Sequence, residues 1–235
     1  MHRHTNHTLW HFRLCPHSRA VRMALDEFGI AVELVDVQPW AWGPELLALN
    51  PAGELPILRI AHGALLCGVW SIAEYLAEAP RGERMGHRTI QLFPGNREDR
   101  AEVRRLADWF LGKFHREVTR ELMLEKVIPL LSGAPSTPDA EVLRAIRAGV
   151  RYHLGYIAFL AYQRRWLAGD EPSFADIAAA AQLSCLDHLG EVPWDEHPPA
   201  RDWYSRMKSR PAMRALLADK VPGVAAPLHY GNPDF

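Results

Sequence analysis

The residues best suited to chemistry lie in the segment LCPHSR at positions 14–19. Cys15 precedes Pro16, and proline suits the first position of a helix because its missing N–H costs nothing there. A cysteine just ahead of a helix N-terminus meets unpaired N–H groups and the positive end of the helix dipole, and both favour its thiolate. Cys15 is therefore a candidate nucleophile, with Ser18 as a second candidate. The alternatives are that Cys15 is a small hydrophobe packed under the helix and that His17 faces solvent.

Cys15 has no second cysteine in a dithiol motif, so its redox chemistry would be that of a monothiol that forms a mixed disulfide. The chain has three cysteines, at positions 15, 67 and 185, without the spacing of a metal site. This odd set is typical of a reducing cytosol rather than of a disulfide framework. Four histidines crowd the first eleven positions, but no Asp, Glu or Cys lies among them, so we expect no metal site.

The composition argues against several classes of function. A net charge of -1 over 235 residues does not suit general nucleic-acid binding, which needs a basic surface. The N-terminus leads into no apolar signal segment, and no uncharged apolar run approaches the roughly 18 residues needed to span a bilayer. We therefore expect a cytoplasmic protein without membrane insertion, long enough for one or two domains.

The segments around Cys15 alternate between strands and helices. In order, they are a strand at 8–12, a helix from 16 closed by Gly29, a strand at 31–37, a short helix at 45–49, strands at 57–60 and 64–66, and a helix at 69–78. Strand, helix and strand within about thirty residues predict a parallel pair. Gly63 predicts an antiparallel hairpin between the last two strands. Pro56 follows a loop at the start of a strand, which makes it a candidate cis-proline.

The remainder of the chain has the pattern of an all-helical region. Apolar residues recur every three or four positions over 97–127, and Pro129 together with the segment at 131–138 is expected to end the helix. Asp139 opens a second helix, and Ser173 with Asp176 caps an alanine-rich one. We divide the chain into a domain at 1–80, a linker at 81–97, an all-helical domain at 98–220 and an extended tail at 221–235.

The element order, the Cys-Pro-His-Ser turn and the loop NPAGELP at 50–56 together resemble the N-terminal domain of glutathione transferases. The capped alanine-rich helix resembles their helical domain. The resemblance implies the glutathione S-transferase fold, an α/β thioredoxin-like N-terminal domain plus an all-α C-terminal domain. In that family the residue at position 15 activates or bonds the glutathione sulfur, and the backbone at Leu55 pairs with the tripeptide.

One part of a glutathione site is missing from the sequence. The family usually holds the glutamyl end with Glu/Gln-Ser, but the corresponding residues here are Gly68 and Val69, which offer neither charge nor donor. Ser71 falls two residues late, which on a helix turns it by about 200°. Losing a charge-assisted contact costs about 1.5–3 kcal/mol, roughly ten- to a hundredfold in affinity. We therefore expect no cofactor, unless backbone N–H groups capture the glutathione carboxylate.

Three further stretches narrow the resemblance to the glutathione-transferase-like division proteins of alphaproteobacteria. They are FHREVTR at 114–120, RWLAGD at 165–170, and the segment from WYSRMKSRP at 203–211 to the terminal YGNPDF. This resemblance implies a homodimer that binds filaments of the tubulin-like protein FtsZ and regulates constriction at the division site, without a need for catalysis.

The same resemblance places the partner-binding surface around the groove that holds glutathione in enzymes. It implies roles for Trp40, Arg116 and Glu125, and the tail adds Asp234 and Phe235. An aromatic residue in a loop is typical of an interface hot spot. Trp42 is a rival for that role, with one of the two tryptophans expected in the core. The two helix charges equally suit ordinary solvated positions, and a tail of this kind either packs on its own domain or serves as a recognition peptide.

The sequence leaves two functions open. The leading hypothesis is a non-catalytic protein that binds FtsZ. The alternative is a glutathione-dependent transferase or a monothiol reductase that uses Cys15. An open, basic pocket at positions 15, 56, 68 and 69 would favour chemistry, whereas a pocket filled by Trp70 would favour an interaction role.

Overall fold

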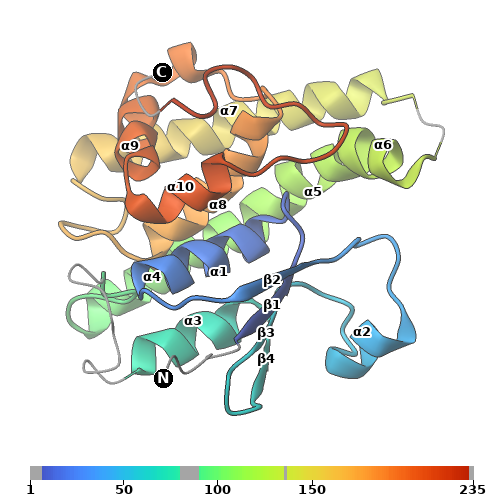
Figure 1. The fold of residues 1–235 in the computed structure, drawn as a ribbon. Coiled ribbons are helices and arrows are strands. Elements are labelled where there is room, and N and C mark those ends of the chain that lie inside the picture. Colours follow the sequence, from blue (N-terminus) through green and yellow to red (C-terminus); the bar gives the residue numbers. More distant parts are fainter. Residues whose placement is uncertain (1–6, 80–89, 135–136, 233–235) are drawn as a thin grey trace.

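A four-stranded sheet with two covering helices lies beside a larger helical region (Figure 1). The computed structural model describes residues 7–79, 90–134 and 137–232. Most of the predicted linker therefore lies outside the described residues, as do His2, His4, Asp234 and Phe235. None of the helices in the described ranges has the length and apolar character needed to cross a membrane.

The sheet has the order β2-β1-β3-β4. Its strands are β1 (Thr8–His11), β2 (Glu33–Asp36), β3 (Ile57–Arg59) and β4 (Leu65–Cys67). β1 runs parallel to β2 and antiparallel to β3, and β3 pairs with β4 in an antiparallel hairpin. The parallel pair and the hairpin confirm the sequence predictions, and the Leu55–Pro56 peptide bond is cis as expected.

Three helices accompany the sheet: α1 (Pro16–Glu27), α2 (Pro44–Leu49) and α3 (Val69–Glu78). Cys15 is the extended residue that precedes α1, and Pro16 occupies the first turn. The helix ends at Gly29, whose φ of 66° is accessible to glycine at little cost. α1 lies between the sheet and the helical region, where it packs against α3, α8 and α10.

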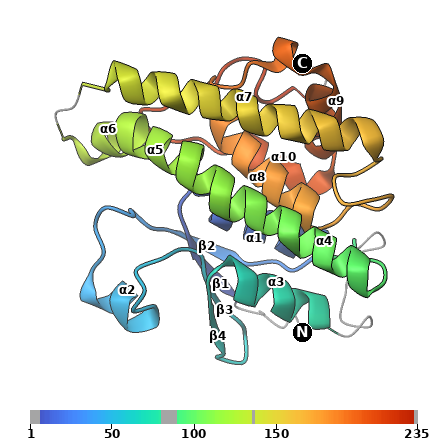
Figure 2. The same ribbon diagram turned by 180° about the vertical axis from the view of Figure 1, so that it is seen from behind.

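The helical region begins with one long helical rod that runs beneath α7 (Figure 2). Its parts are α4 (Arg97–Asp108), η2 (Trp109–Thr119), α5 (Arg120–Leu122), η3 (Met123–Val127) and α6 (Ile128–Ser132), with wider π-type turns in η2 and η3. The rod ends inside the segment that was expected to end it, although not at Pro129 itself. Pro129 lies in the first turn of α6, where no N–H is needed, and the rod ends only at Gly133, which has a φ of 71°.

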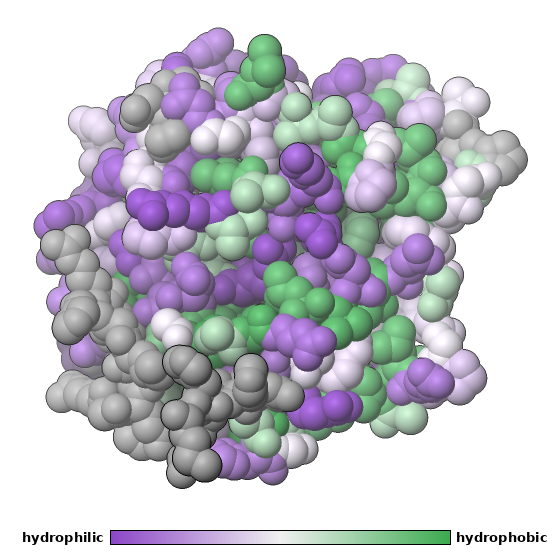
Figure 3. All heavy atoms as spheres, viewed as in Figure 1, coloured by the Kyte–Doolittle hydropathy of each residue, from purple (hydrophilic) through white to green (hydrophobic). Residues whose placement is uncertain are grey.

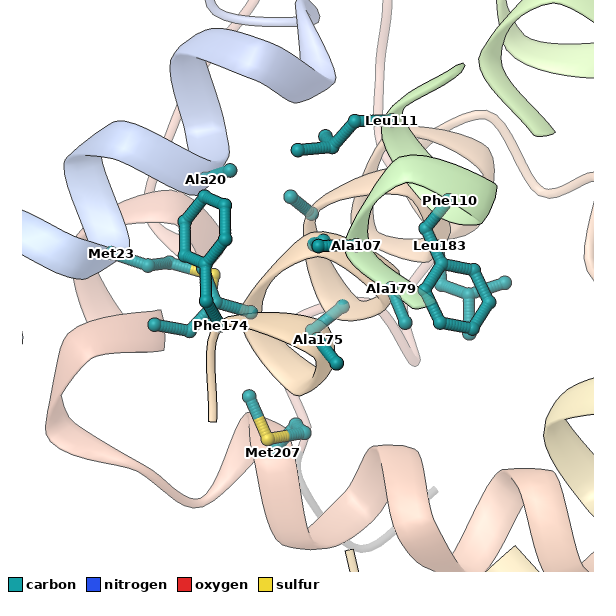
Figure 4. Packing of buried hydrophobic residues seen from close by; sticks show 14 of the residues in the cluster. Ala20, Met23, Ala107, Phe110, Leu111, Phe174, Ala175, Ala179, Leu183 and Met207 are labelled. Carbon is teal, nitrogen blue, oxygen red and sulfur yellow. The ribbon is translucent and has the colours of Figure 1, made fainter. Parts of the chain in front are cut away.

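The remaining elements surround one buried helix. They are α7 (Ala140–Gln163), α8 (Phe174–His188), η4 (Trp194–Glu196), α9 (Pro198–Lys208) and α10 (Pro211–Leu217). Every residue of α8 is buried, and its capping box between Ser173 and Asp176 is formed as predicted. Small side chains such as Ala175 and Ala179 let α1, the long rod and α9 approach it closely (Figure 4).

The segment after α10 lies along the helical region as far as it is described, which answers the question left open for residues 221–232. The side chain of Tyr230 is only 2% exposed. His188 Nε2 lies 3.2 Å from the carbonyl oxygen of Val224, and Lys208 donates to the carbonyl of His229 at 3.1 Å.

Candidate functional site

A groove with a volume of about 670 Å³ lies between the N-terminal loops and the long helical rod. Its lining brings together five of the predicted site residues: Cys15, Leu55, Gly68, Val69 and Arg116. We refer to it as the cysteine groove. Pro56 is buried next to Leu55, and Ser18 is buried beneath Cys15. Trp70 lines the groove without filling it, because its ring packs edge-on against Phe174 at 5.8 Å between centroids.

Cys15 is partly exposed and has the surroundings of a reactive thiol. Burial of its sulfur raises the pKa of the thiol, but hydrogen bonds and charge from His17, together with hydrogen bonds from Ser18, outweigh this and leave the pKa below its usual value. The amide of Cys15 donates to the carbonyl of Phe12 at 3.0 Å, which closes the turn ahead of the helix. These surroundings favour a reactive thiol over the alternative of an inert buried hydrophobe.

His17 does not face solvent as one alternative held. Its Nε2 lies 2.9 Å from the carbonyl oxygen of Leu111 on the long rod, so this nitrogen carries the proton and the other ring nitrogen is free to meet Cys15. Burial lowers the pKa of His17, but the hydrogen bond and charge of Cys15 more than compensate and leave the pKa raised. The contact between the two side chains therefore favours the charged form of each, the thiolate of Cys15 and the imidazolium of His17.

The helical wall of the groove carries mixed charges. Arg116 and Arg120 are exposed, and Asp108 lies about two turns before Arg116. The ring of His115 meets that of His17 edge-on at 4.6 Å, and burial lowers the pKa of His115 to about 3, so it is neutral. Glu54 supplies a further carboxylate from the opposite wall, so the groove is open but only partly basic.

The glutamyl end of the groove has no charged side chain at its two family positions. Gly68 has a φ of 84° and donates its N–H to the carbonyl of Pro56 at 2.9 Å, while Val69 is buried. Ser71 does reach the groove edge, contrary to the expectation from helical spacing. Its hydroxyl, however, hydrogen-bonds the carbonyls of Cys67 and Gly68. Cys15 and Leu55 therefore line the groove where the family handles the sulfur and backbone of glutathione, but positions 68 and 69 offer no side-chain partner for its glutamyl charges.

Trp40 belongs to a different groove, of about 560 Å³, on the side of the sheet where α6 approaches. We call this the tryptophan groove. Apolar residues gather between α6 and the loop after β2 on the face shown in Figure 3. The groove is lined mainly by Phe12, Val37, Trp40, Leu131, Val221 and Pro222, with Arg13, Asp36 and Lys220 as charged members.

Neither tryptophan lies in the core, so the expectation that one of them would be buried was wrong. The ring of Trp40 meets that of Phe12 edge-on at 5.8 Å, and Trp42 lines the cysteine groove instead. Both side chains are half-buried. Each tryptophan thus marks one of the two grooves.

The other predicted contact residues are dispersed. Arg116 lies in the cysteine groove, whereas Glu125 accepts a hydrogen bond from the amide of Asp139 at 2.9 Å and so supports the start of α7. Within the described ranges, no group of three His, Cys, Asp or Glu side chains is arranged to hold a metal.

Sequence reasoning missed His115 and Arg120 as groove residues. A signal was present, because positions 108, 112, 115, 116 and 120 recur every three or four residues and form one polar helix face. It also missed Arg19, which is fully buried and is discussed below.

Comparisons with known proteins agree with this geometry. The family model for the glutathione S-transferase N-terminal domain matches residues 14–79, and the model for the C-terminal domain matches residues 120–211. FtsZ-localized protein A of Caulobacter vibrioides is 40% identical over 97% of this chain and 98% of its own. Two solved structures each superimpose with a TM-score of 0.90. A glutathione S-transferase from Rhodospirillum rubrum is 42% identical and covers 97% of this chain and 100% of its own. FzlA from C. crescentus is 40% identical and covers 98% of this chain and 100% of its own. Sequence, fold and groove agree, and the chain belongs to the glutathione S-transferase family.

Proposed function

We propose that this chain is an FtsZ-associated cell-division protein that binds FtsZ filaments as a homodimer, in the cytoplasm at the division site, and regulates constriction without catalysis. The observation that carries the proposal is the 40% identity, over nearly the full length of both chains, to FtsZ-localized protein A. A match of this extent covers both structural regions and the tail, so it is not a similarity of fold alone.

The cysteine groove supports the non-catalytic part of the proposal. A transferase must hold the charged glutamyl end of glutathione, and Gly68 and Val69 supply no side chain for that task. The groove remains open, and its rim presents Arg116 and Arg120, which suit acidic groups on a partner protein. Arg120 donates to Glu121 at 3.1 Å, whereas the described part of the chain gives Arg116 no ion pair.

The tryptophan groove is the second surface proposed for FtsZ. It combines an aromatic pair, Phe12 and Trp40, with aliphatic walls and the exposed cation of Lys220. Such a combination is typical of a hot spot, in which an apolar anchor is desolvated beside a charged rim. We include Glu125, Asp234 and Phe235 in the proposed contact set on the strength of the family resemblance alone.

The homodimer is supported by an aromatic face formed by the long rod and α7. The side chain of Tyr152 is 55% exposed and lies beside Trp109, whose ring centroid is 4.7 Å from that of Tyr156. Lys113 lies 5.4 Å from the ring centroids of both Trp109 and Tyr152. A large aromatic patch of this kind is typical of a surface that meets a second copy.

Co-pelleting with FtsZ polymers tests the proposal and separates the two grooves. Wild-type protein should sediment with polymerised FtsZ and remain in solution without it. Trp40→Ala should weaken binding at least tenfold if the tryptophan groove makes the contact, because removing a central aromatic anchor costs about 2 kcal/mol. Trp42→Ala is the matched control, since it removes the same side chain from the other groove.

Arg116→Ala completes the test of the cysteine groove, with Arg144→Ala on α7 as a matched exposed control. Loss of binding in Trp42→Ala and Arg116→Ala, with Trp40→Ala unchanged, would move the contact to the cysteine groove. Equal sedimentation of the wild type with and without polymer, measured at salt concentrations near 0.15 M, would contradict the whole proposal.

A second function is favoured by one observation, the contact of Cys15 with His17 in an open groove, which lowers the pKa of the thiol. In this function the Cys15 sulfur attacks one sulfur of a small disulfide and forms a mixed disulfide. The other sulfur leaves as a thiolate, which takes up a proton, and a second low-molecular-weight thiol then releases Cys15.

Incubation with oxidised glutathione, followed by mass spectrometry of the intact protein and its peptides, tests this second function. We expect the adduct on Cys15 under conditions in which Cys67 and the buried Cys185 remain free. Cys15→Ser should abolish the adduct. An adduct confined to Cys67, or none after hours at neutral pH, would exclude monothiol chemistry in this groove.

A further inference from the structure

The described end of the tail is attached to the core through the hydroxyl of one buried tyrosine. The Tyr230 hydroxyl donates to the carbonyl of Leu216 at 3.1 Å and accepts from Arg19 Nη1 at 2.9 Å. The Tyr230 ring meets that of His188 edge-on at 4.9 Å between centroids. The tail therefore ends on a side chain of α1, more than two hundred residues earlier in the sequence.

Arg19 connects the tail to the turn that carries Cys15. Its side chain is fully buried, and Nη1 also donates to the hydroxyl of Ser184 on α8 at 2.9 Å. Nε donates to the carbonyl of Arg13 at 2.6 Å. A single guanidinium group thus holds the tail, α8 and the backbone two residues before Cys15 in one arrangement, and its planar geometry fixes their directions together.

The turn before Cys15 has no regular strand or helix to fix it and depends on such contacts. The carbonyl of Leu14 accepts a hydrogen bond from Cys185 Sγ at 3.3 Å, and the carbonyl of Arg13 accepts from Arg19. The amide of Phe12 meets the hydroxyl of Ser18 at 3.4 Å. If the Arg13 carbonyl loses its donor, the turn gains freedom, and the Cys15 sulfur can move away from its partners.

We infer that the C-terminal segment sets the reactivity of Cys15, with Tyr230 and Arg19 as positioning residues that hold the Cys15 turn in place. Neither side chain touches the sulfur. Tyr230 orients the guanidinium, the guanidinium holds the Arg13 carbonyl, and this carbonyl fixes the start of α1. The inference goes beyond either proposed function, because it concerns the thiol whether the groove serves a protein or a small disulfide.

The direction of the effect follows from the groups around the sulfur. The titratable and charged side chains that face Cys15 or line its groove are His17, Glu54, Cys67, Asp108, His115, Arg116, Arg120 and Cys185. Of these, His17 is the one that stabilises the thiolate by a direct hydrogen bond. Loosening the turn weakens this contact, so the thiol should become harder to ionise and slower to react at neutral pH.

The test is the pH profile of alkylation by iodoacetamide, read separately for each cysteine by peptide mass spectrometry on the full-length protein. Tyr230→Phe removes only the hydroxyl and should move the Cys15 midpoint to higher pH, with alkylation at pH 7 slowed by about threefold, as for half a pKa unit. Ser184→Ala removes the other acceptor of Arg19 Nη1 and should act in the same direction without altering the tail. Tyr162→Phe, at a tyrosine that is 83% exposed on α7, is the matched control.

Cys67 lines the same groove without a contact to Arg19, so its profile should remain unchanged in all variants. Hydrogen exchange at residues 224–232 shows whether the tail is released in Tyr230→Phe. A released tail with an unchanged Cys15 midpoint would overturn the inference. Equal shifts of the alkylation midpoint at Cys15 and Cys67 would also overturn the inference. Such a result would show that the whole groove had become less ordered, and not that Arg19 connects the tail to Cys15.

Discussion

At the scale of single residues, the groove is defined by what surrounds Cys15 rather than by the cysteine itself. A thiol at this position in an apolar setting would be unreactive, because burial alone raises its pKa. His17 reverses this effect, and it can do so because Leu111 on the long rod fixes which of its ring nitrogens carries a proton. The reactive pair is therefore assembled from both structural regions of the chain.

Replacing His17 tests this pair directly. His17→Asn should raise the pKa of Cys15, because the imidazolium that stabilises the thiolate is lost. A charge-assisted hydrogen bond of about 1.5 kcal/mol corresponds to roughly tenfold slower alkylation at pH 7. The pH dependence of iodoacetamide alkylation provides the measurement, and His62→Asn in the exposed β3–β4 turn is the control. An unchanged Cys15 profile would mean that the thiolate does not depend on His17.

The sequence predicted the sulfur side of the groove well, because those residues belong to a local motif. Cys15, Leu55 and Gly68 each lie at a turn whose position follows from proline or glycine. It could not place Trp40 and Trp42 in different grooves. That separation depends on how the loop after β2 passes α6, which is a tertiary contact with no signal in local spacing.

At the scale of elements, the helix starts were predicted well because capping residues mark them. The helix ends were predicted less well, because apolar spacing does not mark where a helix stops. Asp139 and Ser173 both cap the helices expected of them. Pro129 alone does not end the rod, because a proline also fits the first turn of a helical segment, and the end falls at Gly133 inside the predicted segment. The π-type turns of η2 were not predicted, since a wider turn alters side-chain spacing only gradually.

The cap of α8 should be a critical point for stability. Asp176 accepts from the amides of Leu167 and Ser173 and from the indole of Trp203, at 2.9, 3.0 and 2.9 Å, in a fully buried position. Asp176→Ala should lower the free energy of unfolding by at least about 3 kcal/mol, because three buried donors lose their acceptor. Urea unfolding followed by circular dichroism measures the change.

The exposed capping box of α4 offers the matched control for this prediction. Asp99 accepts from the amide of Asn96 at 2.9 Å at the surface, so Asp99→Ala should cost only about 1 kcal/mol. If Asp176→Ala and Asp99→Ala lowered the free energy of unfolding equally, burial of the α8 cap would not add to its contribution.

At the scale of the whole molecule, several histidines are held in buried positions that favour their neutral form. Burial lowers the pKa of His11 and His153 to about 4 and that of His115 to about 3. Their pKa in the unfolded chain is near 6.5. Between pH 6.5 and about 4 the unfolded chain therefore binds more protons, so stability rises with pH across this window and falls on acidification.

Thermal unfolding at pH 7 and pH 5 tests this pH dependence. A histidine that must stay neutral at pH 5 costs about 2 kcal/mol there, equivalent to roughly 4–8 °C in Tm for a chain of this size. His153→Gln removes one such group and should flatten the dependence, whereas His62→Gln should not. His17 opposes the trend, because its raised pKa adds stability in acid that is lost as pH rises through that pKa. A Tm that is constant or higher at pH 5 would contradict the account.

The cysteine groove and the tryptophan groove are both lined by residues of the sheet region and of the helical region. One fold can therefore retain a thiol site in the first and present a protein-binding surface in the second. The central claim is that the cysteine groove keeps the sulfur end of a glutathione site without side-chain partners for its glutamyl charges. Isothermal titration calorimetry with reduced glutathione measures this most directly. We predict no saturable heat up to millimolar concentration, and a micromolar Kd would contradict the claim and favour a glutathione-dependent enzyme.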